Sequence, residues 1–167
     1  MHHQEGEESL VRYLALATAV VLAACSSSGP RLIPLDAAGY SKLIADHKGQ
    51  ILLVDFWATW CEPCLKELPE LARLQKRLPG RFKLLAISAD EPEQEGEAVK
   101  VLLKSGLTPP FFIKRPGEDD AFIRTVDPVW SGALPAVFLY DRQGRRLRSF
   151  IGETQTSVIE AALAELR

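Results

Sequence analysis

The 167-residue sequence has few residues that bind transition metals: three cysteines and three histidines. A structural zinc site needs four ligands, and the Cys61–Cys64 pair has no second cysteine pair to complete one. Histidine cannot replace it, because His47 is the only histidine beyond residue 3. We therefore expect no metal ion, and nothing in the sequence indicates another cofactor.

The sequence also lacks an excess of positive charge. Its formal net charge is -2, whereas proteins that bind nucleic acid usually carry a basic surplus. A nucleic-acid partner is therefore excluded. Four arginines gather around Gly144, and we interpret them as the solvated tip of a hairpin rather than a binding patch. They are Arg142, Arg145, Arg146 and Arg148.

No hydrophobic run is long enough to cross a bilayer, which takes roughly 20 residues. The apolar segment from Tyr13 to Ala24 is shorter and is typical of the core of a secretory signal, which is removed. Such a signal normally begins with basic residues, yet three glutamates precede Arg12. We therefore expect translation to start at Val11 rather than at Met1.

Leu22-Ala23-Ala24-Cys25 resembles the lipobox of bacterial lipoproteins. The resemblance implies a lipoprotein signal peptide at residues 1–25, cleaved before Cys25, with a lipid attached to the Cys25 sulfur. Residues 26–31 would then be a flexible tether, and residues 32–167 the domain. The protein would be anchored on the outer, periplasmic side of a bacterial membrane, where glutathione does not keep thiols reduced. A plain signal peptide with an incidental cysteine is the alternative.

Strands and helices alternate along the remaining chain. The apolar run at 51–57 predicts a strand buried on both faces. The expected elements, in order, are helix 37–47, strand 51–57, helix 65–78, strand 82–88, helix 98–105, a short helix at 121–125, strands 135–140 and 147–151, and a final helix from Ser157. This order predicts a single-domain α/β fold, with a central mixed sheet and helices on both faces.

Details of these elements follow from single residues. Pro69 should kink the helix at 65–78, because it cannot donate to the Leu65 carbonyl. Ser157 and Glu160 have the spacing of a capping box. The closing hairpin should supply antiparallel edge strands. Apart from the short helix, the proline-rich residues 107–130 show no pattern that predicts a helix or a strand.

The chemistry centres on Cys61-Glu62-Pro63-Cys64, which directly follows the buried strand and opens a helix. The unpaired N–H groups and dipole at a helix N-terminus favour a thiolate. We expect Cys61 to be the exposed nucleophile and Cys64, one turn further, to resolve the mixed disulfide. The alternative is an inert structural disulfide or a pair of buried thiols.

The segment Val54-Asp55-Phe56-Trp57-Ala58-Thr59-Trp60-Cys61-Glu62-Pro63-Cys64 resembles the active site of thioredoxin-like proteins. Its continuation at 65–69 and the leader are similar to the TlpA/ResA branch of membrane-tethered thiol–disulfide reductases. The resemblance extends over 32–167 and is loose at 90–130. It implies a thioredoxin-like fold, protein substrates that contain a disulfide, and a membrane electron donor that re-reduces the enzyme.

Three further positions take their roles from this resemblance. Pro135 matches the cis-proline that faces the dithiol, and the backbone of Leu134 would pair with an extended substrate. Asp55 matches a buried acid that moves the proton to and from Cys64, although the TlpA/ResA branch often lacks an acid there. An ordinary polar strand residue is the alternative for Asp55.

The residues around Cys61 refine the expected chemistry. A carboxylate at Glu62 opposes thiolate formation, so we expect mainly a reductant, unlike DsbA with its pKa of roughly 3.5. Pro63 completes the motif. Trp60 should be partly exposed and offer substrate a flat surface, whereas Trp57 should lie in the core. Trp130 is not assigned.

Other functions fit the sequence less well. The reactive cysteine of a peroxiredoxin-like thiol peroxidase needs a threonine three residues earlier and a proline seven earlier. Cys61 has Ala58 and Val54 there. A copper-delivery protein of the Sco type would need a downstream histidine. A non-enzymatic lipoprotein that binds a partner remains open. Among substrates, apocytochrome c during its maturation comes first and general periplasmic disulfide repair second.

Overall fold

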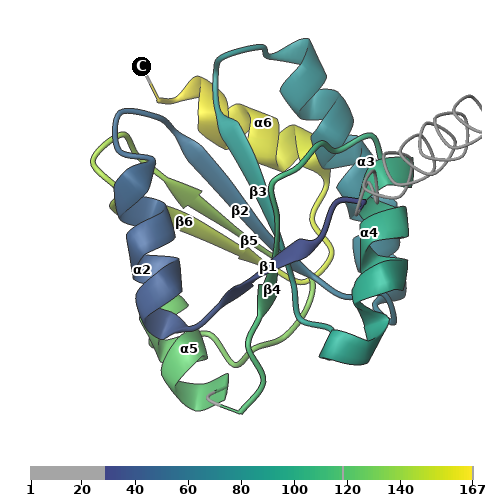
Figure 1. Ribbon diagram of the computed structural model, residues 1–167. Helices are drawn as coiled ribbons and strands as arrows, with labels where there is room; N and C mark the ends of the chain where they lie inside the picture. The colour runs from purple at the N-terminus through teal and green to yellow at the C-terminus, as the bar shows by residue number, and fades with distance from the viewer. Residues whose placement is uncertain (1–28, 118, 167) are drawn as a thin grey trace, which may run out of the picture.

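Six strands form one mixed sheet in the order β1-β4-β3-β2-β5-β6 (Figure 1). The computed structural model describes residues 29–117 and 119–166. The strands are β1 (Leu32–Leu35), β2 (Leu52–Trp57), β3 (Lys83–Ser88), β4 (Phe111–Lys114), β5 (Ala136–Tyr140) and β6 (Arg146–Ile151). The first four are parallel, β5 runs antiparallel to β2, and β6 runs antiparallel to β5.

Helices cover both faces of this sheet (Figure 1). The α-helices are α2 (Ala37–Asp46), α3 (Glu62–Arg77), α4 (Glu95–Lys104), α5 (Asp119–Val126) and α6 (Thr156–Ala164), and Pro92–Gln94 form the 3-10 helix η1. One apolar cluster joins the sheet to α3, α4 and α6, and a second joins it to α2 and α5. The predicted α/β architecture is confirmed. None of the described helices has the length and apolar character that a membrane span requires.

The central strand β2 is buried at all its positions. Its side chains alternate between the two apolar clusters: Leu53 and Trp57 pack with α3, and Val54 and Phe56 pack with α2 and α5. This explains the continuous apolar run in the sequence and confirms Trp57 as a core residue. The strand ends at Trp57, so the residues that follow emerge at the carboxyl edge of the parallel strands.

Several expectations about single elements were wrong. Strands β1 and β4 were not predicted. Strand β5 is internal, because β2 and β6 flank it, so only one strand of the closing hairpin, β6, lies at an edge of the sheet. Helix α6 begins at Thr156 with Gln155 as its N-cap and no side-chain capping bond, so Ser157 lies inside the helix. Helix α3 is continuous through Pro69, and the kink expected there stays a prediction.

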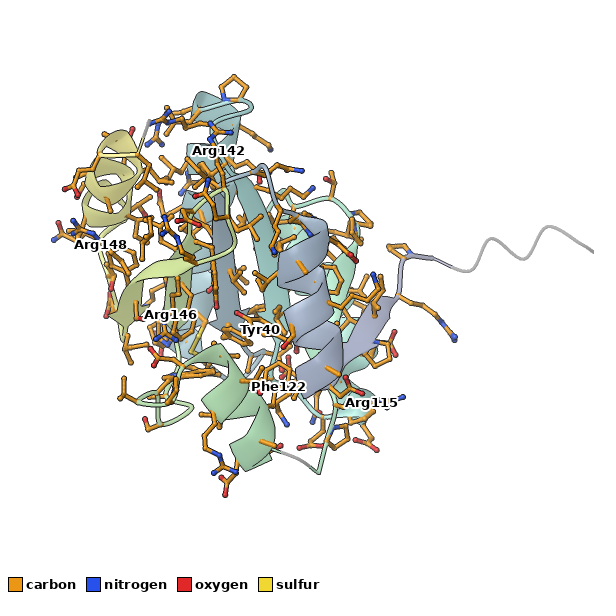
Figure 2. The ribbon with its side chains drawn as sticks, turned by 90° about the vertical axis from the view of Figure 1, so that its left-hand side faces the viewer. Tyr40, Arg115, Phe122, Arg142, Arg146 and Arg148 are labelled. Carbon is orange, nitrogen blue, oxygen red and sulfur yellow. A yellow bond between two sulfur atoms is a disulfide. The ribbon has the colours of Figure 1, made fainter. Side chains whose placement is uncertain are left out.

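The arginines of the hairpin do not form one patch, and Arg142, Arg146 and Arg148 lie apart in Figure 2. Their partners differ: Arg142 donates to the Gly49 carbonyl, Arg145 pairs with Asp141, Arg146 with Asp127, and Arg148 with Glu165. The interpretation as a solvated tip is wrong for Arg146. Its side chain is only 28% exposed, and its guanidinium lies 2.9 Å from an Asp127 carboxylate oxygen and 6.0 Å from the centre of the Phe138 ring.

Candidate active site

Cys61 and Cys64 form a disulfide at the start of α3, with their Cα atoms 5.3 Å apart. Cys61 is the N-cap residue, and Cys64 lies in the first turn. Pro63 is the second helical residue, where the absence of an N–H costs no helical hydrogen bond. The Cys61 N–H donates to the Ala58 carbonyl (3.1 Å), which closes a tight turn between β2 and the helix. The motif therefore lies at the positive end of a helix dipole.

The expectation that Cys61 is exposed is wrong for the disulfide form. Only 5% of Cys61 and 1% of Cys64 is accessible to solvent. The reason is that both cysteines belong to the apolar cluster beneath α3, against which Leu134 also packs. Cys61 remains the more accessible of the two, so an attacking thiolate would reach the disulfide at the Cys61 sulfur.

Trp60 and Pro135 lie at the same edge of the sheet as the disulfide. Trp60 immediately precedes Cys61 and is 69% exposed. The Leu134–Pro135 peptide bond is cis, as the resemblance implied. Strand β5 begins one residue later and pairs Ala136 with Phe56, which places Pro135 opposite the end of β2. The loop that holds it is fixed further by a bond from the Gly152 N–H to the Pro135 carbonyl (2.8 Å).

Trp130, which the sequence left unassigned, contacts this loop from the core side. It is buried, its ring lies 4.9 Å from that of Phe56, and its Nε1 donates to the Ala133 carbonyl (2.9 Å). This bond ends one residue before Leu134. Trp130 therefore connects the core to the segment that carries the cis-proline.

Two buried carboxyl groups lie on the elements that meet at Cys64. Asp55 is 1% exposed and shares the face of β2 that packs against α3, while Glu67 is 8% exposed and follows Cys64 by three residues on α3. Within the described residues, none of their four oxygens has a hydrogen-bond partner. Unpaired buried carboxylates are costly, so burial shifts both groups toward the protonated form.

The pKa values reflect this burial. Loss of solvation raises the pKa of Asp55 well above its ordinary value, and the charge of Glu67 raises it further. Burial, followed by the charge of Glu153, raises the pKa of Glu67 to about 7. A carboxyl group with such a pKa can both accept and give a proton at neutral pH.

Glu67 and Glu153 were missed by the sequence reasoning. Glu67 carried a signal, since it is a charged residue on the apolar face of α3 beside Leu68 and Leu71. Glu153 carried none, because only the fold brings the segment after β6 close to Glu67.

Glu62 and Lys66 form an exposed ion pair (2.9 Å) on the first turn of α3. The hydrogen bond and charge of Lys66 lower the pKa of Glu62. Glu62 is therefore a carboxylate at neutral pH, as the sequence argument assumed. The ammonium of Lys66 offsets part of its effect on Cys61.

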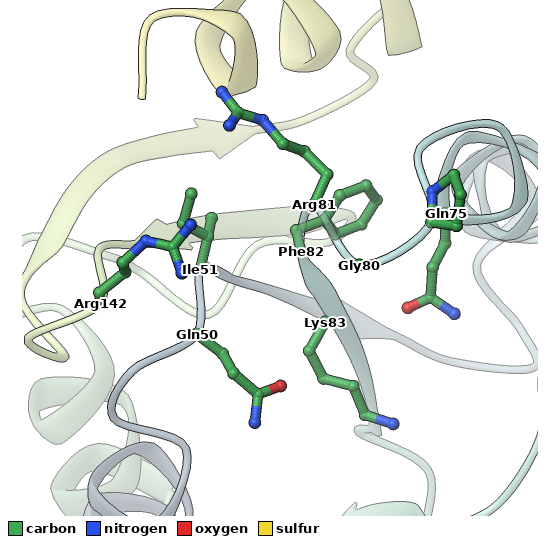
Figure 3. Close-up of a pocket in the computed structure, with 9 residues that line it drawn as sticks. Gln50, Ile51, Gln75, Gly80, Arg81, Phe82, Lys83 and Arg142 are labelled. Carbon is green, nitrogen blue, oxygen red and sulfur yellow. The ribbon is translucent and has the colours of Figure 1, made fainter. Parts of the chain in front are cut away.

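One cavity of about 390 Å³ lies at the opposite end of the parallel strands (Figure 3). It is lined by the residues just before β2, by residues 79–83 at the start of β3, by Gln75 of α3 and by Arg142, and none of them is a cysteine or an acid. It therefore takes no part in the redox site. Among the described residues no three side chains gather in a way that could hold a metal ion. Cys25 lies outside the described residues.

Known proteins resemble this chain in sequence and in fold. The family model for the AhpC/TSA family matches residues 30–145. Thiol-disulfide oxidoreductase ResA from Bacillus cereus is 30% identical over 138 residues, which cover 82% of this chain and 75% of the relative. StoA from Bacillus subtilis has a TM-score of 0.52 at 25% identity, covering 68% of this chain and 82% of its own.

A DsbF homologue from Corynebacterium diphtheriae has a TM-score of 0.63 at 22% identity, covering 74% of this chain and 76% of its own, which is a likeness of fold. The family match extends from β1 to the β5–β6 turn and spans the positions of the cysteine pair. This match and the ResA relatives show that this chain belongs to the AhpC/TSA family, as a thiol–disulfide oxidoreductase of the ResA type.

Proposed function

We propose that this oxidoreductase mainly reduces disulfide bonds of proteins outside the cytoplasm. The observation that carries the proposal is the Cys61–Cys64 pair at the N-terminus of α3, next to the cis-proline loop and in front of two buried acids. The relatives named thiol-disulfide oxidoreductase support the reaction class. The TlpA/ResA resemblance supports apocytochrome c as one substrate.

The reaction transfers two electrons to the substrate. The Cys61 thiolate attacks one sulfur of the substrate disulfide, so that bond breaks, a mixed disulfide forms, and the first substrate thiolate leaves and takes up a proton. Cys64 then gives its proton to the buried carboxyl pair, and its thiolate attacks the Cys61 sulfur. The second substrate thiolate leaves, and the Cys61–Cys64 disulfide remains.

Asp55 and Glu67 would handle the proton of Cys64. Both are shielded from water and lie on the elements that meet at this cysteine. Trp60 would contact the substrate chain through its exposed ring, and the Leu134 backbone would pair with it next to Pro135. An external dithiol donor at the membrane must return two electrons after each turnover.

The attachment to a membrane belongs to the same proposal. Residues 1–25 would be a lipoprotein signal, with Val11 as the start, and Cys25 would carry the lipid. Cys25→Ser should move the protein from the membrane fraction to the soluble fraction. N-terminal sequencing of the precursor that finds Met1-His2-His3 would contradict the start at Val11.

Insulin reduction tests the reaction. The purified protein with dithiothreitol should accelerate reduction of the insulin disulfides, and Cys61→Ser should abolish this. Cys64→Ala should accumulate a mixed disulfide with insulin, visible as a shifted band that a reductant removes. No acceleration by the unaltered protein would refute the proposal. Peroxide consumption by the same sample would instead favour a thiol peroxidase.

A further inference from the structure

The turn that carries Trp60 and Cys61 is held by a carboxylate from a neighbouring strand end. The turn spans Ala58 to Cys61, with Thr59 and Trp60 at its centre. Within the described residues, Thr59 makes the only side-chain-mediated hydrogen bonds of the turn, all with Asp90. Asp90 follows β3 and lies 31 residues further along the chain.

Asp90 is 2% exposed and fully engaged by donors. Its Oδ1 accepts from the Thr59 backbone N–H (2.9 Å) and from the Thr59 hydroxyl (2.6 Å). Its Oδ2 accepts from the Ser88 hydroxyl (2.7 Å) and lies 3.1 Å from the Thr59 nitrogen. Both oxygens of Asp90 therefore have donors at hydrogen-bond distance, which holds the side chain in one orientation.

The residues around Asp90 are themselves bonded to the sheet. Ser88 is fully buried and lies beside Trp57 in the β2–β3 register. The next residue, Ala89, donates its N–H to the Trp57 carbonyl (2.8 Å). The Asp90 N–H donates back to the Ser88 hydroxyl (3.0 Å). Asp90 therefore joins the rigid ends of β2 and β3 to the turn in front of α3.

We propose that Asp90 is a positioning residue for disulfide exchange: through Thr59 it fixes the turn that presents Trp60 and sets Cys61 at the N-terminus of α3. The proposal rests on exchange at Cys61. Exchange needs three sulfurs in line, and small misplacements of reacting groups reduce rates strongly. Thiolate stabilisation by the helix N-terminus also falls off within its first turn.

Thr59→Val tests the connection without changing any charge, because valine keeps the shape of threonine and removes the hydroxyl. We expect kcat/KM for insulin reduction to fall about tenfold. In a Cys64→Ala background, we expect the pH midpoint of Cys61 alkylation by iodoacetamide to rise by about half a pH unit. Thr59→Ser retains the hydroxyl and should restore both values to within about twofold of the unaltered protein.

A double-mutant cycle tests whether Asp90 acts through Thr59. Asp90→Asn should lower kcat/KM, and Thr59→Val added to it should cost little more, because interacting residues are not additive. Asp141→Asn is the matched control. Asp141 also accepts two backbone N–H groups and a side-chain donor (2.9, 2.9 and 2.8 Å), but in the β5–β6 turn away from the disulfide. The Asp141→Asn variant should be less stable than the unaltered protein and should keep its rate of disulfide exchange.

Three results would overturn the proposal. They are an unchanged rate and midpoint in Thr59→Val, a Thr59→Ser variant as impaired as Thr59→Val, and an equal loss of exchange in Asp141→Asn. An unaltered protein that does not reduce insulin would instead refute the proposed function. Circular dichroism of each variant separates a displaced turn from an unfolded chain.

Discussion

Asp55 is a carboxyl group placed among apolar side chains with no described hydrogen-bond partner. The pKa of Asp55 is raised in the folded protein. Below its unfolded pKa of about 4, Asp55 is protonated in both the folded and the unfolded chain, and the folded protein keeps its full stability. As pH rises, Asp55 ionises more readily in the unfolded chain, so this stability is lost. Asp55→Asn should therefore raise the free energy of unfolding at pH 8 by about 1 kcal/mol or more, and by less at pH 4.

Urea unfolding of the oxidised protein at these two pH values measures the effect. Asp46→Asn, which removes an exposed carboxylate paired with Lys42, should leave the unfolding midpoint nearly unchanged at both. A loss of stability in Asp55→Asn at pH 8 would show that the carboxylate is better accommodated than its surroundings indicate. Insulin reduction by the variant should be slower, because one proton acceptor for Cys64 is gone.

Glu67 titrates in the range where the enzyme would work. With its pKa at about 7, deprotonation allows it to accept the Cys64 proton, so the resolution of the mixed disulfide should accelerate as pH rises through 7. Glu67→Gln should remove this inflection and slow resolution at pH 8 by roughly tenfold. Stopped-flow release of a fluorescent substrate thiol measures the step.

Glu70→Gln is the control for Glu67, because Glu70 lies on the same helix with an exposed carboxylate paired to Arg73. It should retain the inflection near pH 7. An inflection that persists in Glu67→Gln would assign the proton transfer to another group.

At the scale of elements, Gly132 shapes the loop that leads to Pro135. Its φ is +84°, and an added Cβ would lie 2.8 Å from Cδ1 of Ile123 on α5. Gly132→Ala should destabilise the protein by about 2 kcal/mol and raise the KM for insulin, because the shifted loop carries Leu134. Thermal unfolding and insulin kinetics measure these effects.

Gly49→Ala separates backbone strain from steric conflict. Gly49 has a φ of +95° and open space around its Cβ position, so its substitution should cost only about 1 kcal/mol and leave KM unchanged. If the two alanine variants lose the same stability, Ile123 moves aside freely and the loop is not tightly fixed.

The elements differ in how far the sequence could predict them. The β2–turn–α3 unit was predicted because a continuous apolar run, a Cys-x-x-Cys motif and a helical apolar face lie next to one another in the sequence. Strands β1 and β4 have four residues each, and their pairing of Leu32 with Phe111 is a long-range contact that local patterns do not encode.

The same distinction applies within the site. Cys61, Cys64 and Trp60 follow from spacing along one segment. The exposure of Cys61 was misjudged, because its burial depends on the apolar cluster to which Leu134 also contributes. The bond between Thr59 and Asp90 joins residues 31 positions apart, and it follows from the β2–β3 register rather than from any motif.

For the molecule as a whole, we expect the carboxyl groups around the dithiol to favour the direction in which the protein reduces its substrate. Asp55 and Glu67 lie behind Cys64 and Glu62 lies beside Cys61, while the charge of Lys66 is engaged by Glu62. Negative charge disfavours a thiolate, and a strong oxidant such as DsbA depends on a stabilised reduced form. In this protein the carboxyl groups offset part of the thiolate stabilisation by the helix N-terminus, so the disulfide form should be favoured.

Reduction potential and folding stability are linked in one thermodynamic cycle, so each predicts the other. We expect a potential in the range of thioredoxin and glutaredoxin, roughly -270 to -200 mV, and a higher urea midpoint for the oxidised than for the reduced protein. Asp55→Asn combined with Glu67→Gln should raise the potential, because it removes charge that opposes the thiolates. Glu62→Gln should raise it less, because that carboxylate is exposed and paired with Lys66. A potential near roughly -120 mV, or a reduced protein that resists urea better than the oxidised one, would show that the thiolate is stabilised by groups other than these.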